Sequence, residues 1–289
     1  MRYIEPSFSE IKESDPFKKI AYVAHNCYQV EKNGQEKEFV MRILSFKHLA
    51  MVEHYMLAAE ISKELYERLI GFHNRFIILA REGGLFYASF SLRPLLDQKD
   101  VKNTPLSGLI VLLPDELKNL FDIGGLDLKR EGKILSEEEI DKLPITIYEK
   151  IKNVTVRIVT DRGVTHEIVR HRLASYAQES TRYCNYANDK FGKELTFIKP
   201  LDYNKFSEIY DRLFSQSEKN YFELLENGSS PEMARGVLPS KLKATIIMTA
   251  DIEEWKVFFA LRCDSRAHPD MRQISIPMQE YFRKEGYIR

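Results

Sequence analysis

The chain has 289 residues, 44% of them hydrophobic and 30% charged, a composition typical of a globular protein that is large enough to bury a substantial core. Its 43 Lys and Arg residues balance its 43 Asp and Glu residues, which argues against nucleic acid or a membrane surface as a partner. Three dispersed cysteines argue against a disulfide framework or a thiolate metal site, and without a membrane-spanning apolar run or an amino-terminal targeting signal we expect a cytoplasmic protein.

The amino-terminal half is predicted to contain much helix. Residues 17–30 mix apolar and polar side chains at helical spacing, and a longer periodic pattern covers residues 36–70. Residues 98–146 are polar and irregular, with several Gly and Pro residues that are typical of turns and loops. We expect a peripheral, partly helical insertion there.

A strand is predicted at residues 154–160, where the β-branched sequence VTVRIVT alternates in polarity. Residues 161–163 then form a turn, and Thr165 can cap a helix that carries the sequence HEIVRHRLAS. Residues 179–188 are expected to be an irregular segment that leaves the end of this helix.

Two predicted helices follow. A helix is predicted at residues 205–227, because apolar side chains share one face and Gly228 stands just past the end. Ser230 and Pro231 form a typical helix start, opening a short helix that holds Arg235 and ends near Pro239.

The last part of the chain combines a strand-like run with a capped helix. Residues 243–248 are apolar and partly β-branched, and Asp251 and Glu254 have the capping-box spacing of a helix that runs towards Arg262. Together these patterns predict an α+β fold that is rich in helix.

The most unusual stretch is Arg170-His171-Arg172, followed after seven residues by Ser180-Thr181-Arg182. Arginine presents a planar fork of donors that suits phosphate, pyrophosphate or the carbonyl edge of a pyrimidine. Taken alone, the cluster is as compatible with a solvated basic helix face as with an anion site.

Two other kinds of site are less favoured. Ser180 has no His or Lys beside it in the sequence to act as a base, so a substrate contact is preferred over a nucleophile. His48 and His54 are six residues apart, which does not place them on one helix face, so we expect no metal.

The stretch resembles the signature of the flavin-dependent thymidylate synthases, RHR, seven residues, then S-x-R, at every fixed position. Three further blocks are similar to the family in the same order: residues 48–54 (H-x4-E-H), 234–239 (A-R-x-x-L-P) and 261–264 (L-R-x-D). The resemblance extends over about residues 20–280, and residues 55–150 are longer than in compact members.

The resemblance implies one helix-rich α+β domain over residues 1–289, with a small mixed or antiparallel sheet and a peripheral insertion at about residues 55–150. It implies methylation of dUMP to dTMP, with methylenetetrahydrofolate as carbon donor, FAD as cofactor and NADPH as hydride source. It also implies a homotetramer whose active sites are built from more than one subunit.

Site residues are implied in the same way. The residues expected to contact FAD are His48, Arg170, His171, Arg172, Gln178 and Asp251. The residues expected to contact dUMP are Glu167, Arg170, Gln178, Ser180, Arg182, Arg235 and Arg262. Arg262 is the expected catalytic residue, because in the family it faces the uracil ring and favours the ionised base. Without this resemblance, His171, Arg235 and Arg262 would be ordinary structural residues.

The expected chemistry agrees with these residue types. Uracil C5 becomes nucleophilic only when negative charge develops on the ring, and a fixed guanidinium stabilises that charge where water is excluded. None of the cysteines stands in an activating setting, whereas the flavin-free synthases need an attacking thiolate. Hydride transfer belongs to the flavin.

Four positions depart from the family pattern. Glu167 replaces a glutamine that binds dUMP, Ala50 replaces a hydroxyl residue near the flavin, and Asp251 and Val257 replace asparagines that touch FAD. Asp251 has an alternative role as a helix cap. These departures leave two rivals open: another flavin-dependent pyrimidine modification such as hydroxymethylation, and a non-catalytic nucleotide- or nucleic-acid-binding relative.

Overall fold

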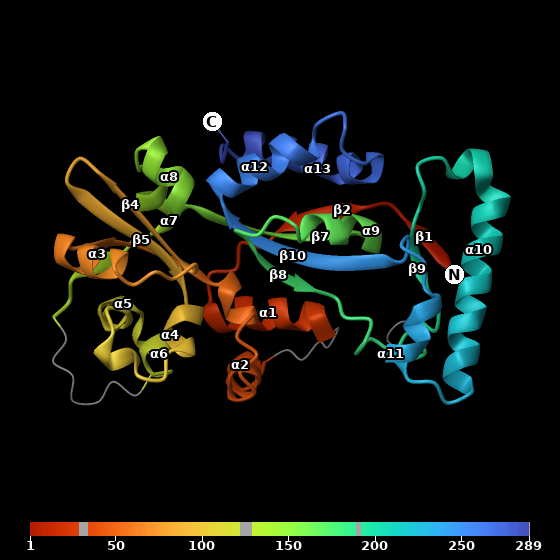
Figure 1. Ribbon diagram of the computed structural model, residues 1–289, viewed down its shortest axis with the longest axis horizontal. Coiled ribbons are helices and arrows are strands. Elements are labelled where there is room, and N and C mark those ends of the chain that lie inside the picture. The colour runs from red at the N-terminus through yellow and green to blue at the C-terminus, as the bar shows by residue number, and fades with distance from the viewer. Residues whose placement is uncertain (29–33, 122–128, 189–191, 289) are drawn as a thin grey trace.

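The computed structural model describes residues 1–28, 34–121, 129–188 and 192–288. Helices and mostly antiparallel strands are mixed, so the predicted α+β class is confirmed (Figure 1). No helix among the described residues is long and apolar enough to cross a membrane. Two four-stranded sheets and one two-stranded sheet divide the structure into three regions.

The central sheet is antiparallel throughout. Its strands, in spatial order, are β2 (Ser7–Glu10), β7 (Asn153–Asp161), β10 (Lys243–Asp251) and β8 (Ser175–Gln178). β7 pairs with β10 along nine residues, from Asn153 opposite Asp251 to Asp161 opposite Lys243. The strand predicted at residues 154–160 is therefore confirmed and extends by one residue at each end.

Helices cover both faces of the central sheet (Figure 1). One face packs, through a core that includes Trp255 and Phe282, against α8 (Ile145–Ile151), α12 (Ile252–Arg262) and α13 (Pro269–Lys284). The other face contacts α1 (Pro16–Tyr28), whose Val23 and Cys27 meet Ala177 and Ile247. The helix predicted at residues 17–30 is confirmed as far as residue 28; residues 29–33 lie outside the described residues.

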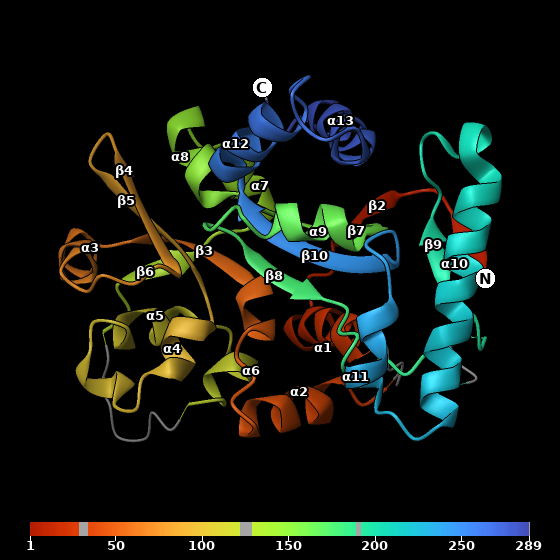
Figure 2. The same cartoon turned by 45° about the vertical axis from the view of Figure 1, so that its right-hand side comes forward.

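A second antiparallel sheet lies beside the first (Figure 2). Its strands, in spatial order, are β4 (Ile77–Glu82), β5 (Leu85–Ser91), β3 (Met56–Ile61) and β6 (Gly132–Ile134). Gly83 and Gly84 form the hairpin turn between β4 and β5 with φ of 59° and 83°, the conformation that favours glycine at both positions. This sheet lies within the predicted insertion of residues 55–150; the assignment of residues 1–289 to one domain stays a prediction.

Short helices complete the second region around its own hydrophobic core. They are α2 (Glu36–Ser45), the 3-10 helix η1 (Met51–His54), α3 (Lys63–Ile70), α4 (Arg93–Asp97), the 3-10 helix η2 (Val101–Asn103), α5 (Ser107–Leu112) and α6 (Asp115–Lys118). The short helix α7 (Glu137–Asp141) instead packs its Ile140 into the core of the central sheet. The helical prediction for residues 36–70 was wrong at β3. Residues 56–61 have helical spacing and helix-forming side chains, but pairing with β5 and β6 overrides that preference.

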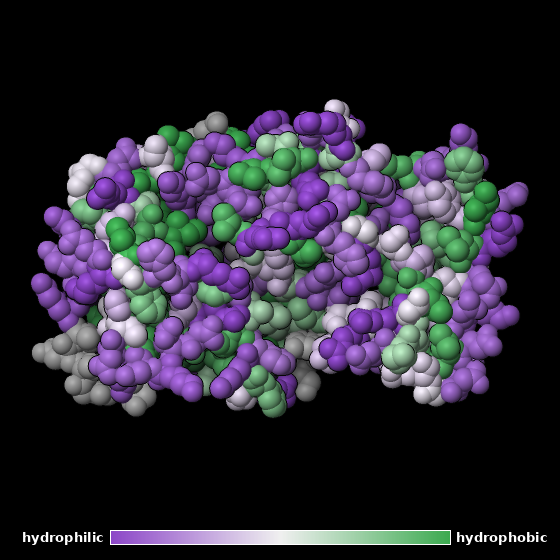
Figure 3. Space-filling view, in the orientation of Figure 1, coloured by the Kyte–Doolittle hydropathy of each residue, from purple (hydrophilic) through white to green (hydrophobic). Residues whose placement is uncertain are grey.

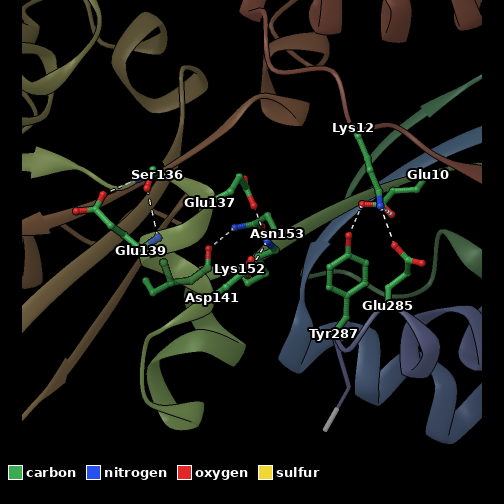
Figure 4. A network of polar contacts seen from close by, with 11 residues as sticks. Glu10, Lys12, Ser136, Glu137, Glu139, Asp141, Lys152, Asn153, Glu285 and Tyr287 are labelled. Atoms are coloured by element: carbon green, nitrogen blue, oxygen red, sulfur yellow. Dashed lines mark hydrogen bonds and ion pairs between the residues drawn. The ribbon is translucent and has the colours of Figure 1, made fainter.

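The inserted chain is fixed where it returns to the central sheet (Figure 4). The buried ammonium of Lys152 lies between the carboxylates of Glu137 and Asp141, and Asn153 Nδ2 donates to Ser89 Oγ at 2.8 Å. Close by, Tyr287 donates to Glu10 at 2.8 Å. These contacts join the second region, the start of β7 and the carboxyl terminus into one packed body.

The third region lies at the other end of the molecule (Figure 1). β1 (Arg2–Ile4) pairs in parallel with β9 (Thr196–Ile198), and both pack with α10 (Tyr203–Glu226) and α11 (Pro231–Ala234). The predicted helix at 205–227 and the Ser230 cap are confirmed, since Ser230 accepts from the Met233 amide. The 3-10 helix η4 (Arg235–Val237) follows directly.

The predicted start and end of the helix after β7 were wrong. Asp161, not Thr165, caps α9 (Arg162–Ile168), because its carboxylate accepts from the Val164 amide at 2.8 Å. The helix ends before Arg170, so the RHR sequence lies in the loop between α9 and β8. Tyr176 secures that loop by donating to the His171 carbonyl at 2.7 Å, with the Ile168 carbonyl at 3.0 Å.

Candidate functional site

Three sequence-predicted residues meet at the end of α12. Arg262, the last residue of that helix, donates from Nη1 to Glu167 Oε2 at 3.0 Å and from Nη2 to the Glu167 carbonyl at 2.8 Å. Its Nε donates to His171 Nε2 at 3.0 Å. These contacts connect α12, α9 and the RHR loop around one guanidinium.

The contact with Arg262 defines the protonation state of His171. Nε2 accepts a hydrogen bond, so it carries no proton and the neutral ring is protonated at Nδ1. Burial and the positive charge of Arg262 lower the pKa of His171 to about 4. Glu254 Oε1 lies 3.7 Å from Nδ1, and burial raises the pKa of Glu254 as well. His171 is therefore a neutral acceptor that orients Arg262.

Arg262 retains donors for a ligand. A guanidinium has five N–H groups, and the contacts with Glu167 and His171 use three of them. One N–H remains on each terminal nitrogen. Because three contacts hold the group in one plane, its remaining donors are oriented in advance, as stabilisation of a developing negative charge requires.

The RHR loop separates its residues by environment. His171 is buried, whereas Arg170 and Arg172 on either side are exposed. Alternation of this kind presents two guanidinium groups at the surface, one on each side of the residue that binds Arg262. Two exposed guanidinium groups fit the pyrophosphate of a dinucleotide such as FAD.

The segment after the loop is fixed by β8 and by a buried carboxylate. Gln178, the last residue of β8, donates to Thr165 Oγ1 on α9 at 2.8 Å. The next residue, Glu179, is buried and pairs with Lys243 at 2.6 Å and with the Tyr186 hydroxyl at 3.1 Å. The chain then turns irregularly, as predicted for residues 179–188, and presents Ser180.

A second group of predicted residues lies where this segment meets α11. Arg182 Nε is 3.1 Å from Glu232 Oε1, in a half-exposed ion pair. Arg235 Nη1 donates to Thr181 Oγ1 at 3.5 Å, a long contact. Ser180 Oγ accepts from the backbone amide of Arg182 at 3.3 Å, and its role in binding dUMP stays a prediction.

His48 and Asp251 stand apart from these groups. His48 is exposed in the turn after α2, whereas His54 is fully buried with Nδ1 2.8 Å from Thr249 Oγ1. Asp251 caps α12 by accepting from the Glu254 amide at 2.7 Å, about 16 Å from Arg262 at 1.5 Å per helical residue. A flavin role for either residue stays a prediction.

The other departures from the family pattern also have clear positions. Ala50 lies at the start of η1 and is partly buried, and Val257 is exposed on the outer face of α12. Glu167 is the most informative departure, because its carboxylate binds Arg262 directly.

Several residues around the site had no role in the sequence interpretation. Glu254 was predicted only as part of a capping box, but it also faces His171. Glu53 belongs to the H-x4-E-H block, and its partner Arg93 lies 40 residues further along the chain. No local signal could have identified Arg93.

Comparisons with known proteins match the part of the chain that carries this geometry. The family model described as thymidylate synthase complementing protein matches residues 147–285. The flavin-dependent thymidylate synthase of Pyrococcus furiosus is 37% identical over 131 residues, which cover 44% of this chain and 53% of that protein.

Two other relatives carry the same description. That of Sulfurisphaera tokodaii is 37% identical over 123 residues, covering 43% of this chain and 47% of that protein. That of Geobacter sulfurreducens is 32% identical over 117 residues, covering 40% and 50% respectively. The chain thus spans about half the length of the curated relatives it matches, and the second sheet lies outside the matched family segment. Residues 147–285, which hold Arg262, Glu167 and the RHR loop, are thus similar to the flavin-dependent thymidylate synthases.

Proposed function

We propose that the protein is a flavin-dependent thymidylate synthase, which methylates dUMP to dTMP with methylenetetrahydrofolate as carbon donor and NADPH as reductant. The observation that carries the proposal is Arg262, held by Glu167 and His171 with two N–H groups remaining. The similarity of residues 147–285 to the family model, and of this part of the chain to the curated flavin-dependent thymidylate synthases, supports it.

Arg262 would act on the uracil ring. Negative charge that develops on the base would be stabilised by the two remaining N–H groups, which need no reorganisation because three protein contacts already fix the plane. Glu167 would position Arg262, and its second carboxylate oxygen would contact the ring edge of dUMP. The neutral state of His171 keeps Arg262 in place over the physiological pH range.

FAD would be held by the exposed Arg170 and Arg172, with His171, Gln178, His48 and Asp251 as further proposed contacts. The flavin would supply the hydride chemistry that no side chain can provide. Ser180, Arg182 and Arg235 would bind dUMP, chiefly its phosphate, because arginines and a hydroxyl suit that group. The ion pair between Arg182 and Glu232 would open or rearrange to admit the phosphate.

We also propose a homotetramer in which each site draws on more than one subunit. Leu173 and Leu261 are 75% and 58% exposed, although they lie next to Arg172 and Arg262 in the sequence. Apolar patches also gather at the far end of the surface, over α10 and α11, where Ile209, Leu213 and Met233 are exposed (Figure 3). Exposed apolar surface of this kind is typical of an interface.

The absorption spectrum of freshly purified protein and product analysis test the proposal. We expect bound FAD, and conversion of dUMP to dTMP with release of tetrahydrofolate. Protein that neither carries nor binds FAD would contradict the proposal. Stoichiometric dihydrofolate would indicate the flavin-free chemistry, and a hydroxymethylated nucleotide would favour the rival activity that the Glu167 replacement leaves open.

A further inference from the structure

A buried carboxylate stands directly before the residues proposed to bind the dUMP phosphate. The side chain of Glu179 is 1% exposed. Its Oε2 accepts from Lys243 Nζ at 2.6 Å and from the Thr245 amide at 3.3 Å, and its Oε1 accepts from the Tyr186 hydroxyl at 3.1 Å. Burial of a charge is costly unless a counter-charge and hydrogen bonds compensate for it. Both oxygens of Glu179 have such partners, so the carboxylate is held in one orientation.

The partners of Glu179 belong to two different regions. Lys243 and Thr245 lie on β10 of the central sheet, and the Glu179 amide donates to the Thr245 carbonyl at 2.8 Å. Tyr186 packs in the core of the third region, where its ring meets that of Tyr221 on α10 edge-on, with centroids 5.8 Å apart. The Tyr186 amide also donates to the Tyr221 hydroxyl at 3.4 Å. Glu179 therefore joins the end of β8 to the third region.

The contact between Glu179 and Tyr186 also closes residues 179–186 into a loop. Within this loop the Ser180 carbonyl accepts from the Cys184 amide at 2.9 Å, and the Ser180 hydroxyl accepts from the Arg182 amide at 3.3 Å. Ser180 and Arg182 lie between the two ends that the carboxylate joins. Their positions therefore depend on both ends of the loop.

We infer that Glu179 is a positioning residue, which together with Tyr186 fixes the loop that presents Ser180 and Arg182 to the phosphate of dUMP. The inference rests on the proposed function in assigning this loop to the phosphate. Without the Tyr186 hydroxyl, one buried carboxylate oxygen would lose its donor, whereas the ion pair with Lys243 would remain. The loop would then lose a contact that joins its two ends.

The first experiment is hydrogen exchange on the whole protein with no nucleotide added. Tyr186→Phe and Glu179→Ala should each speed amide exchange across residues 180–186. Tyr3→Phe is the matched control, because Tyr3 packs against the same core and its hydroxyl also donates to a carboxylate, Asp211 Oδ1, at 2.7 Å. It should leave exchange in the loop unchanged.

The second experiment compares the binding of dUMP with that of deoxyuridine, which lacks the phosphate. Tyr186→Phe should weaken dUMP binding about tenfold, a factor that corresponds to about 1.4 kcal/mol. Deoxyuridine binding should not change, because a displaced loop affects the phosphate contacts and not those of the base. The double variant Glu179→Ala/Tyr186→Phe should bind dUMP no more weakly than the worse single variant, because both substitutions remove the same contact.

The outcomes separate the inference from the proposed function. Unchanged loop exchange in Tyr186→Phe, equal losses for dUMP and deoxyuridine, additive losses in the double variant, or an equal loss of dUMP binding in Tyr3→Phe would overturn the inference. If the unaltered protein binds no dUMP, the proposed function fails, whereas the exchange experiment still decides whether Glu179 and Tyr186 fix the loop.

Discussion

Arg262 Nε lies 3.0 Å from His171 Nε2, and this contact joins the end of α12 to the RHR loop. An arginine that faces an imidazole requires the ring to be neutral, because a protonated ring has no acceptor to offer. The candidate catalytic group and its neighbour are therefore coupled, because protonation of His171 would remove one of the three contacts that orient Arg262.

Arg262→Lys should bind FAD nearly normally but lose most methyl transfer. A lysine ammonium is a point donor. It cannot contact the Glu167 carboxylate, the Glu167 backbone carbonyl and His171 in one plane as the guanidinium does. Loss of one preorganised donor costs on the order of 3 kcal/mol in the transition state, about a hundredfold in rate. Separate measurement of flavin reduction and dTMP formation checks this. Equal slowing of both steps, or of neither, would contradict the role given to Arg262.

His171 should make stability fall in mild acid. Its folded pKa of about 4 is below the ordinary value of 6.5, so the unfolded chain binds the proton more readily. The contribution of neutral His171 to the free energy of unfolding is complete above pH 6.5. It is lost as the pH falls towards 4, and the loss is at most about 3 kcal/mol. His54 titrates in the same direction, so the test compares unfolding free energies of the unaltered protein and His171→Gln. Parallel pH profiles for the two would show that His171 contributes nothing.

Local signals predicted much of the fold. β7 was predicted from alternation, and the Ser230 and Asp251 caps from residue type and spacing, because each depends on a few neighbouring residues. β3 was not predictable in this way. Its helical spacing is genuine, but strands from residues 85–91 and 132–134 pair with both of its edges, and those partners are distant in the sequence.

The site shows the same limit. Arg262, Glu167 and His171 were each identified through the family resemblance, yet their mutual contacts join residues 91 and 95 positions apart. The replacement of glutamine by Glu167 seemed to concern dUMP alone. In the folded chain it also changes the charge next to Arg262, which only the three-dimensional arrangement reveals.

Asp251→Asn should stabilise the protein at neutral pH. Burial, opposed by hydrogen bonds from the start of α12, raises the pKa of Asp251 to about 6, above its ordinary 3.8. Stability from this group is complete below pH 3.8 and is lost as pH rises through 6. Asparagine can still cap the helix without a buried charge, so we expect a gain of roughly 1 to 3 kcal/mol at pH 7.5 and almost none at pH 4. Thermal unfolding of flavin-free protein at both pH values measures the gain in stability. An equal gain at both pH values would exclude ionisation of Asp251 as the cause of the gain.

Ser180→Ala should keep measurable activity with weaker dUMP binding. In the folded chain its hydroxyl accepts from the Arg182 amide, and a hydroxyl that donates one hydrogen bond to a phosphate contributes roughly 0.5 to 3 kcal/mol. Equilibrium binding of dUMP and steady-state turnover distinguish the roles. Complete loss of turnover with unchanged dUMP binding would instead identify Ser180 as a nucleophile.

Glu167→Gln should speed methyl transfer while leaving FAD binding nearly unchanged. Glutamine keeps an oxygen that can accept from Arg262 Nη1, and the contact between Nη2 and the backbone carbonyl does not depend on the side chain. The substitution removes a negative charge that lies 3.0 Å from the guanidinium. That charge opposes the negative charge that develops on the base during methyl transfer. At an effective dielectric constant of about 20 the change should amount to roughly 1 kcal/mol, or about fivefold in rate.

The matched control is Glu149→Gln, which removes the same charge from an ion pair with Lys256 on the outer face of α12. It should leave the rate of dTMP formation unchanged. Single-turnover measurement of dTMP formation from the reduced enzyme compares the variants without interference from substrate binding. A hundredfold lower rate of dTMP formation in Glu167→Gln would show that the carboxylate is needed for more than orienting Arg262. The amide oxygen can replace the carboxylate as a hydrogen-bond acceptor, but the amide has neither the charge nor the basicity of the carboxylate.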